Sequence, residues 1–310
     1  MPTLREVSPS DPVSTRSLDW FEEAAPILQD AEFVVEGGDA SRDKDRAGSA
    51  DTGGLFRDIG EDIADTPGSR NHRLTPKRIV RIAASVDSVT EDRQQDPDEE
   101  LMIQVEEESY EKGYAFQEAY FNADNGSNSK AFDGLAAICA ARSLVDTPAS
   151  PITLPLGNSD ANRQAQQDAM EKLLVFFMWT RATHAYMPVQ LKTRLMVIAK
   201  GLGYYQQTQD ELGNMVDQIG DTIIRSAGFA SDQSDEEVLK FNETVGGNST
   251  TASIFAANHS EMGLKCVTSA GLVMRTFQRS DFLVAKGNLD MNIVLTNTRN
   301  LRQYKGWALS

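Results

Sequence analysis

AFQEAYFNAD (residues 115–124) and KAFDGL (residues 130–135) are the two stretches from which the fold of this chain is best worked out. The first has the character of a helix end, and a long helix can be traced back from it to Pro97. Proline suits a first helical turn, and the three acids after it suit the positive end of the helix dipole. Aromatic residues recur on one face of the segment. We therefore predict a helix over residues 97–121 that runs into a turn.

The turn shares residue types with a calcium-binding loop over Asn122 to Gly126. Its glycine falls at the fifth position, whereas a calcium loop needs glycine at the sixth. We interpret it as a helix C-terminus that leads into a turn.

Charge is distributed unevenly around this helix. Residues 87–111 hold eleven acids and a single base, Arg93, whereas residues 262–310 hold seven bases and two acids, a net charge of +5. An acidic helix face is usually a solvated face. Here, however, a basic segment lies in the same chain, which favours pairing between subunits.

Upstream of the helix, residues 1–16 are polar and rich in proline, and we expect an extended arm that cannot start a helix. A short amphipathic helix should follow over residues 17–30, ended or kinked at Pro26, and then a strand at 33–35. Residues 39–73 are rich in Gly, Asp and Arg and are too many for an ordinary connection. With a returning strand over 77–86, they suggest a long two-stranded excursion.

Downstream of the helix, helical and strand patterns interleave without a regular βαβ repeat, which indicates an α+β fold. We predict helices from Asp160 to Trp179 and from Leu191 to Gly201, with Gly201 as the stop, and a surface loop over the acidic run 232–237. Strands are expected at 184–187, 222–224, 252–257, 264–268, 272–277 and 291–295, the last continuing to 307.

Length and composition exclude several classes of protein. The 310 residues suggest about two domains, and the net charge of −16 disfavours a nucleic-acid-binding module, because such a surface repels phosphate. No apolar run is long enough for a membrane span, and no secretory signal is recognised. Cys139 and Cys266 lie in apolar stretches and are expected to be buried free thiols.

No catalytic constellation is visible. His72, His184 and His259 are widely separated, no cysteine pair has zinc spacing, and no phosphate loop or nucleophile elbow occurs. We therefore predict no catalytic, cofactor-binding or metal-binding residues and no cofactor. An acidic cytosolic enzyme whose carboxylates bind Mg²⁺ remains an alternative hypothesis.

The two opening stretches resemble the major capsid proteins of tailed bacteriophages, in which a long spine helix ends in an aromatic-rich "FNGD"-like turn followed by "FDGL". Ala123 stands where that turn often has glycine. Residues 20–33 are similar to the family's N-terminal helix and its continuation, and residues 184–205, 253–257 and 271–275 are similar to its later elements. The matches extend over nearly the whole chain.

This resemblance implies a four-part layout. Residues 1–16 would be an N-arm, 36–88 an extended E-loop, 135–285 an axial A-domain, and residues 17–35, 89–134 and 286–310 a peripheral P-domain. The implied function is that of a major capsid protein, a structural subunit and not an enzyme. It would assemble into hexamers and pentamers of an icosahedral head that encloses double-stranded DNA. An encapsulin-type compartment shell, which shares the fold, is the alternative.

The resemblance also implies partners and a location. The chain would associate with itself, with a separate scaffolding protein, a portal and decoration proteins, and with packaged DNA only through weak non-specific contacts, without a membrane. It would be made in the host cytoplasm and reside in the virion. Our candidate interface residues are Arg57, Arg70, Arg73, Glu99, Glu100, Glu106, Glu107, Arg299 and Arg302.

Some members of that family join a loop lysine to a neighbour's asparagine. Within the expected loop this chain offers Lys44, which lies between two aspartates, and Lys77, which lies beside Arg78. An ammonium group must lose its proton before it can act as a nucleophile, and neither setting favours that. We therefore expect no covalent cross-links.

Overall fold

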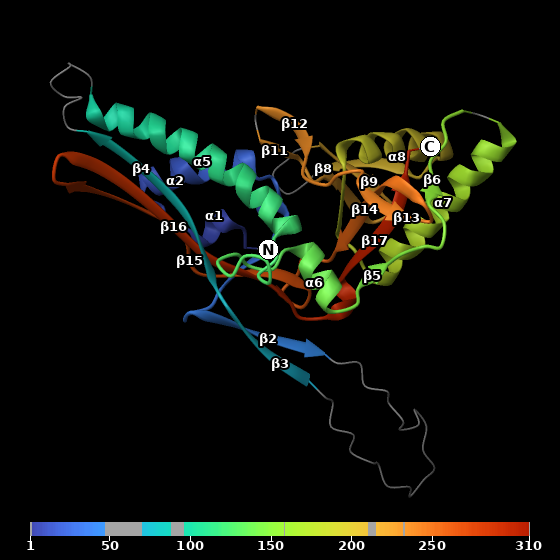
Figure 1. Cartoon of the computed structure of the whole chain (residues 1–310), viewed down its shortest axis with the longest axis horizontal. Helices are drawn as coiled ribbons and strands as arrows, with labels where there is room; N and C mark the ends of the chain where they lie inside the picture. The colour runs from blue at the N-terminus through green and yellow to red at the C-terminus, as the bar shows by residue number, and fades with distance from the viewer. Residues whose placement is uncertain are drawn as a thin grey trace, which may run out of the picture.

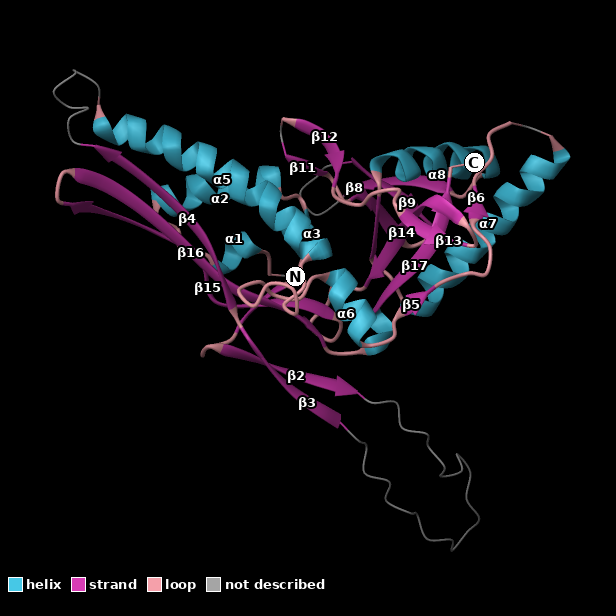
Figure 2. Ribbon diagram, viewed as in Figure 1, coloured by secondary structure: helices cyan, strands magenta, loops and turns pink. Residues whose placement is uncertain are grey.

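The structure is a computed structural model that describes residues 2–46, 70–87, 96–157, 159–209, 215–231 and 233–309. For residues 42–46 and 70–73 only the course of the backbone is described. The described residues form two large sheets with helices packed on them and two separate two-stranded pairs (Figures 1 and 2).

The spine of the molecule is the helix α5 (Pro97–Asn122), which confirms the prediction from the sequence. Asp96 caps its first turn and accepts a hydrogen bond from the amide of Asp98 at 3.0 Å. Together with α2 (Pro12–Ala24), α5 lies on a four-stranded sheet of order β1-β15-β16-β4. The strands of this sheet are β1 (Phe33–Val35), β4 (Arg78–Asp87), β15 (Leu264–Arg279) and β16 (Phe282–Leu295).

The close approach of α2 and α5 depends on Gly113. A Cβ atom at this position would lie 2.5 Å from the Cβ of Ala24 and 2.9 Å from the carbonyl oxygen of Phe21. Gly134 has a similar role after the turn, because a Cβ there would lie 2.7 Å from the carbonyl oxygen of Ala119. Both glycines therefore set how tightly the helix end is packed.

The expectation of an extended N-terminal arm is wrong. Residues 2–16 contain α1 (Leu4–Val7) and the start of α2, and Leu4 is fully buried. Asp11 accepts a hydrogen bond from the amide of Ser14 at 3.0 Å, and Pro12 occupies the first helical position. The proline that was expected to prevent a helix therefore begins one. As expected, α2 stops before Pro26, and the short helix α3 (Ile27–Asp30) follows it.

The second sheet has nine strands, in the order β5-β17-β14-β7-β10-β9-β8, with β13 on β14 and β6 on β17. Its strands are β5 (Val145–Asp146), β6 (Ile152–Thr153), β7 (His184–Met187), β8 (Tyr205–Gln209), β9 (Met215–Ile219), β10 (Thr222–Ser226), β13 (Glu243–Val245), β14 (Asn248–Ala257) and β17 (Leu301–Ala308). β17 is preceded by the 3-10 turn η1 (Thr298–Asn300).

Two helices pack on one face of the nine-stranded sheet, α7 (Asp160–Thr180) and α8 (Val189–Leu202). The end of α5 and the short α6 (Leu135–Ala141) lie on the other side. The predicted helix from Asp160 and the strand 184–187 are confirmed. The predicted helix stop at Gly201 is wrong, because α8 ends at Gly203, which takes the left-handed conformation with φ 78°.

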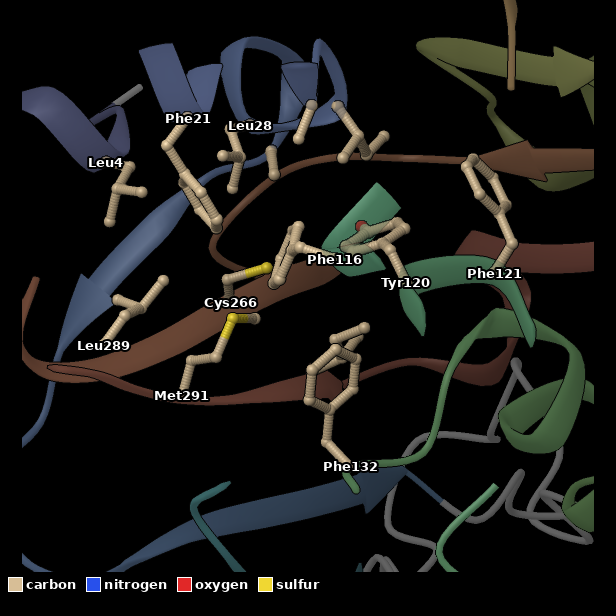
Figure 3. Close-up of a cluster of buried hydrophobic side chains, with 14 of the residues drawn as sticks. Leu4, Phe21, Leu28, Phe116, Tyr120, Phe121, Phe132, Cys266, Leu289 and Met291 are labelled. Carbon is tan, nitrogen blue, oxygen red and sulfur yellow. The ribbon is translucent and has the colours of Figure 1, made fainter. Parts of the chain in front are cut away.

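One hydrophobic core joins the two sheets (Figure 3). Phe116 packs against Phe21 and Phe132, with ring centroids 5.5 and 5.9 Å apart. Phe121 reaches the other sheet, where its ring lies 5.4 Å from Tyr186 and 6.0 Å from Phe255. The stretch AFQEAYFNAD is therefore the place where the two halves of the molecule meet. Cys139 and Cys266 are buried free thiols, as expected.

The sheets divide the chain differently from the expected layout. β15 and the first residues of β16, up to residue 285, lie within the segment assigned to the axial domain, yet these two strands pair with β1 and β4 beneath α5. β17, assigned to the peripheral domain, pairs with β14 in the nine-stranded sheet. Judged by the sheet that each strand joins, the chain leaves the nine-stranded sheet between β14 and β15. It returns to that sheet before β17.

Two further segments complete the fold. The hairpin of β2 (Ala40–Arg46) and β3 (Arg70–Pro76) is a two-stranded excursion, as expected, but its returning strand is β3. The returning strand predicted over 77–86 is instead β4, which pairs with β16 in the four-stranded sheet. The expected surface loop at 232–237 contains β12 (Ser234–Glu237), which pairs with β11 (Phe229–Ser231) in a ribbon beside α5. In the described part of the chain, no helix is both long and apolar enough to cross a membrane.

Candidate assembly surfaces

Side-chain hydrogen bonds tie the base of the β2–β3 hairpin to the body of the molecule. Lys77, whose side chain is 2% exposed, donates to Ser269 Oγ at 2.8 Å and to the carbonyl oxygen of Glu36. Asn292 Nδ2 donates to Ser41 Oγ at 2.7 Å. Within the described residues, the two strands pair with each other and with no third strand, and they extend away from the body (Figure 1). An isolated two-stranded hairpin is marginally stable in water.

The acidic candidates lie along α5. Glu99 and Glu107 are exposed, and Glu100 and Glu106 are half-buried. Part of this face borders a hollow of about 870 Å³ between α5 and the β11–β12 ribbon, lined by Glu106, Glu107, Glu111 and Glu118 among others. Tyr110, in the same hollow, donates a 2.6 Å hydrogen bond to Glu23, which raises the pKa of Tyr110 to about 12. Glu106 and Glu107 therefore border this hollow, whereas Glu99 and Glu100 do not line it.

The basic candidates near the C-terminus gather around Trp179. Arg302 donates to Asp146 at 2.7 Å, and its guanidinium lies 4.1 Å from the centre of the Trp179 ring. Arg299 is exposed, and its Nε donates to the carbonyl oxygen of Trp179 at 2.9 Å. Arg302 is thus partly neutralised within its own chain, whereas Arg299 presents its charge to solvent.

The structure does not bring the acidic and basic candidates together within one chain. The first turns of α5 lie at one end of the molecule, far from the strand β17 in the nine-stranded sheet (Figure 1). Arg70 and Arg73 lie in β3, in register with Arg46 and Asp43. Arg57 lies outside the described residues. Any pairing between the two sets of charges would therefore join different copies of the chain.

An apolar surface on α7 was missed by the sequence analysis. Val175, Met178 and Trp179 are 59%, 76% and 45% exposed. Val175 and Trp179 line a hollow of about 670 Å³ together with Phe176 and Tyr304. The signal was present in the uninterrupted apolar run from Leu173 to Trp179, which places apolar residues all around the helix. One side of α7 fills the core, and the opposite side is exposed to solvent when the chain is alone.

A buried polar cluster joins α3 to the nine-stranded sheet and was also missed. We call Asp30, His184, Tyr186, Arg225 and His259 the junction cluster. Arg225 lies 3.0 Å from Asp30, and the hydroxyl of Tyr186 is 2.9 Å from His259 Nε2 and 3.3 Å from Asp30 Oδ2. The two histidine rings, 75 residues apart in the sequence, have centroids 5.2 Å apart.

Burial decides the protonation of the junction cluster. It lowers the pKa of His184 and lowers the pKa of His259 well below its ordinary value, since a charged imidazole would lose its solvation. Both rings are therefore neutral at pH 7. In the described residues, no group of three or more His, Cys, Asp or Glu side chains is arranged to hold a metal ion.

Comparison with known proteins identifies the fold. No protein-family model and no curated protein matches the sequence. Among solved structures, the chain is similar to one in the holo-SrpI encapsulin complex from Synechococcus elongatus, with a TM-score of 0.58 and 11% identity over 91% of this chain and 86% of that one. It is similar to the capsid of the empty GTA particle, with a TM-score of 0.55 and 11% identity over 92% and 90% of the two chains.

A chain of Mycobacterium phage Bobi has a TM-score of 0.51 and 11% identity over 92% of this chain and 91% of that one. These likenesses extend over nearly the full length of each chain. The protein therefore has the mixed helix and sheet fold that phage capsid proteins share with encapsulin shells, which confirms the fold class predicted from the sequence.

Proposed function

We propose that this chain is a major capsid protein: a structural subunit, not an enzyme, that assembles into hexamers and pentamers of an icosahedral phage head. The observation that carries the proposal is the β2–β3 hairpin, an arm that extends from the body and pairs only with itself. A monomer gains no stability from such an arm. A neighbour in a closed shell would cover it and would in turn be covered.

The layout of the subunit follows from the two sheets. We propose that the four-stranded sheet with α2 and α5 is the peripheral domain and that the nine-stranded sheet with α7 and α8 is the axial domain. The hairpin and the chain between its strands would be the E-loop. The exposed apolar side of α7 would face the adjacent axial domain, because an exposed apolar patch marks a surface that contacts another protein.

The charge of the chain suits the proposed contents. A net charge of −16 makes tight binding of phosphate unfavourable, and packaged double-stranded DNA would touch the shell only weakly and without sequence preference. We propose that scaffolding, portal and decoration proteins are separate chains, that the subunit is made in the host cytoplasm, and that it resides in the virion. The encapsulin alternative shares the fold and differs in the cargo.

Sedimentation and negative-stain microscopy of the purified protein test the proposal. The expected result is capsomers or closed shells, formed alone or with a scaffolding protein. A monodisperse monomer under all salt and scaffold conditions contradicts it. Nucleic acid inside the isolated particles supports the phage head, whereas an enclosed protein cargo supports the encapsulin alternative.

A further inference from the structure

The C-terminal end of α7 and the turn η1 together form a surface that is both apolar and basic. Arg299 Nε donates to the carbonyl oxygen of Trp179 at 2.9 Å, and Asn300 Nδ2 donates to that of Met262 at 3.1 Å, so η1 joins the two segments. Met178 and Met262 are 76% and 77% exposed. We call this surface the end patch and define it by five residues: Met178, Trp179, Arg181, Met262 and Arg299.

The charge of the end patch is not neutralised within the chain. Arg181 and Arg299 are exposed, and neither forms an ion pair in the described part of the molecule. The acid next to the patch in the sequence is Glu261, so the net charge stays positive. Arg181 ends α7 in the left-handed conformation, with φ 52°, which glycine usually takes at this position. Folding alone therefore favours glycine there, and the charge of Arg181 is available to a partner.

The hollow between α5 and the β11–β12 ribbon has the opposite charge. It measures about 870 Å³, and no base is among its lining residues. Glu107 and Glu118 are exposed and form no ion pair with another described residue, whereas Glu111 pairs with Lys112 at 2.9 Å. We call it the glutamate hollow, and its charged and aromatic lining residues are Glu106, Glu107, Tyr110, Glu111, Tyr114 and Glu118.

The end patch and the glutamate hollow are chemically complementary. A guanidinium group donates hydrogen bonds to carboxylates and stacks on a tyrosine ring, and the hollow offers both. Methionine side chains adapt to irregular surfaces and contact aromatic rings favourably, which suits Tyr110 and Tyr114. Tryptophan and arginine are also the residues that most often carry the binding energy of an interface. Each surface therefore supplies what the other lacks.

The fold keeps the two surfaces of one chain apart. Figure 1 shows α5 and the β11–β12 ribbon along one long edge of the molecule, and the end of α7 with the start of β17 along the opposite edge. A chain therefore cannot fill its own hollow, whereas a copy beside it can. The end patch also continues the apolar side of α7, which already has an adjacent copy as its proposed partner.

We propose that the glutamate hollow of one copy is the seat for the end patch of an adjacent copy, with Arg181 and Arg299 placed among its carboxylates. This inference rests on the proposed function, since it requires copies to assemble, and it adds the two surfaces that meet and the charges that hold them. The contact is heterologous, because different parts of the same chain meet, and a repeated contact of this kind generates a ring when the rotation between copies closes.

A charge swap tests the proposal. Arg181→Glu with Arg299→Glu should leave the subunit folded, as judged by circular dichroism, and should raise the concentration needed for assembly at least about tenfold. Adding Glu107→Arg and Glu118→Arg to the same chain should restore assembly, because every contact then has the opposite polarity. Reversals without effect on assembly, or a fourfold variant that assembles no better than the double variant, overturn the proposal.

Two further variants separate the contact from general charge and from folding. Lys130→Glu with Arg163→Glu makes the same change in net charge at exposed positions elsewhere and should assemble like the wild type. Arg181→Gly should keep or raise the melting temperature, since glycine suits the left-handed conformation, and should still weaken assembly. Equal weakening by the Lys130 and Arg163 reversals, or a fall of both melting temperature and assembly in Arg181→Gly, counts against the contact.

Crosslinking locates the contact directly. Met178→Cys places a thiol on the end patch and Glu118→Cys places one in the glutamate hollow, and both native cysteines are buried. Particles assembled from equal amounts of the two variants and treated with a short bis-maleimide should give a dimer band on denaturing gels, and particles of either variant alone should not. Mixed particles that assemble and give no dimer overturn the docking proposal. Failure of the wild type to assemble overturns the proposed function instead.

Discussion

The junction cluster makes the stability of the subunit depend on pH in a way that can be calculated. His184 and His259 are buried and neutral in the folded chain, and their pKa values are lowered, whereas in the unfolded chain both titrate near their ordinary pKa of about 6.5. Below that pH the unfolded chain binds more protons than the folded chain. The free energy of unfolding therefore falls as the pH falls, until the histidines titrate in the fold.

If both rings stay neutral in the fold, lowering the pH from about 7.5 to about 5.5 removes about 2.7 kcal/mol from the free energy of unfolding. Three charged or titratable groups face the rings: Asp30 from α3, Arg225 from β10 and Tyr186 from β7. Asp30 favours the charged form of His184, whereas Arg225 and burial oppose it. The raised pKa of the partly buried Glu22 acts in the opposite direction at lower pH.

Urea unfolding of the unassembled subunit, followed by tryptophan fluorescence at three pH values, measures this slope. His184→Gln with His259→Gln should lower stability at pH 7.5 by about 1–3 kcal/mol and should remove most of the loss on acidification. His72→Gln is the matched control, because His72 lies in the hairpin strand β3, and it should keep the wild-type slope. Equal slopes for the wild type and the double variant would refute the reasoning.

Five further predictions follow from the packing and the surfaces. Gly113→Ala should destabilise the subunit by about 1–3 kcal/mol in thermal or chemical unfolding, because its Cβ would collide with α2. Gly201→Ala, in an open helical position, should stabilise it by up to about 1 kcal/mol. Replacing residues 47–69 with Asn-Gly should leave a folded subunit by circular dichroism that no longer forms shells, and unchanged assembly would count against the arm. Arg299→Glu should weaken assembly, measured by light scattering, while changing the free energy of unfolding by less than about 1 kcal/mol, since the side chain is exposed. Boiled particles should run as a single band near 34 kDa on denaturing gels, because Lys77 is buried and held at the hairpin base; a ladder of larger bands would contradict this.

The sequence by itself determined the elements whose signals are local. The helix 97–122 could be predicted because a proline, a cluster of acids and a periodic aromatic face all lie within one segment. The strand 184–187 and the long hairpin excursion were likewise readable from short runs of residues. The N-terminal helices were missed because the prolines were weighed as helix breakers, although Pro12 follows a capping aspartate and occupies a first turn.

Only the tertiary structure decided which distant segments meet. Pairing of β15 with β1, and of β17 with β14, joins residues separated by more than 40 positions, and no periodicity in the sequence specifies such partners. His184 and His259 are far apart in the sequence, and only the fold brings them into one buried cluster. The fold likewise gathers Arg81, Arg279 and Lys286 around one concavity of the four-stranded sheet. Local patterns encode secondary structure because its hydrogen bonds are close in sequence, whereas surfaces and buried clusters form only when the packed core brings strands from the whole chain together.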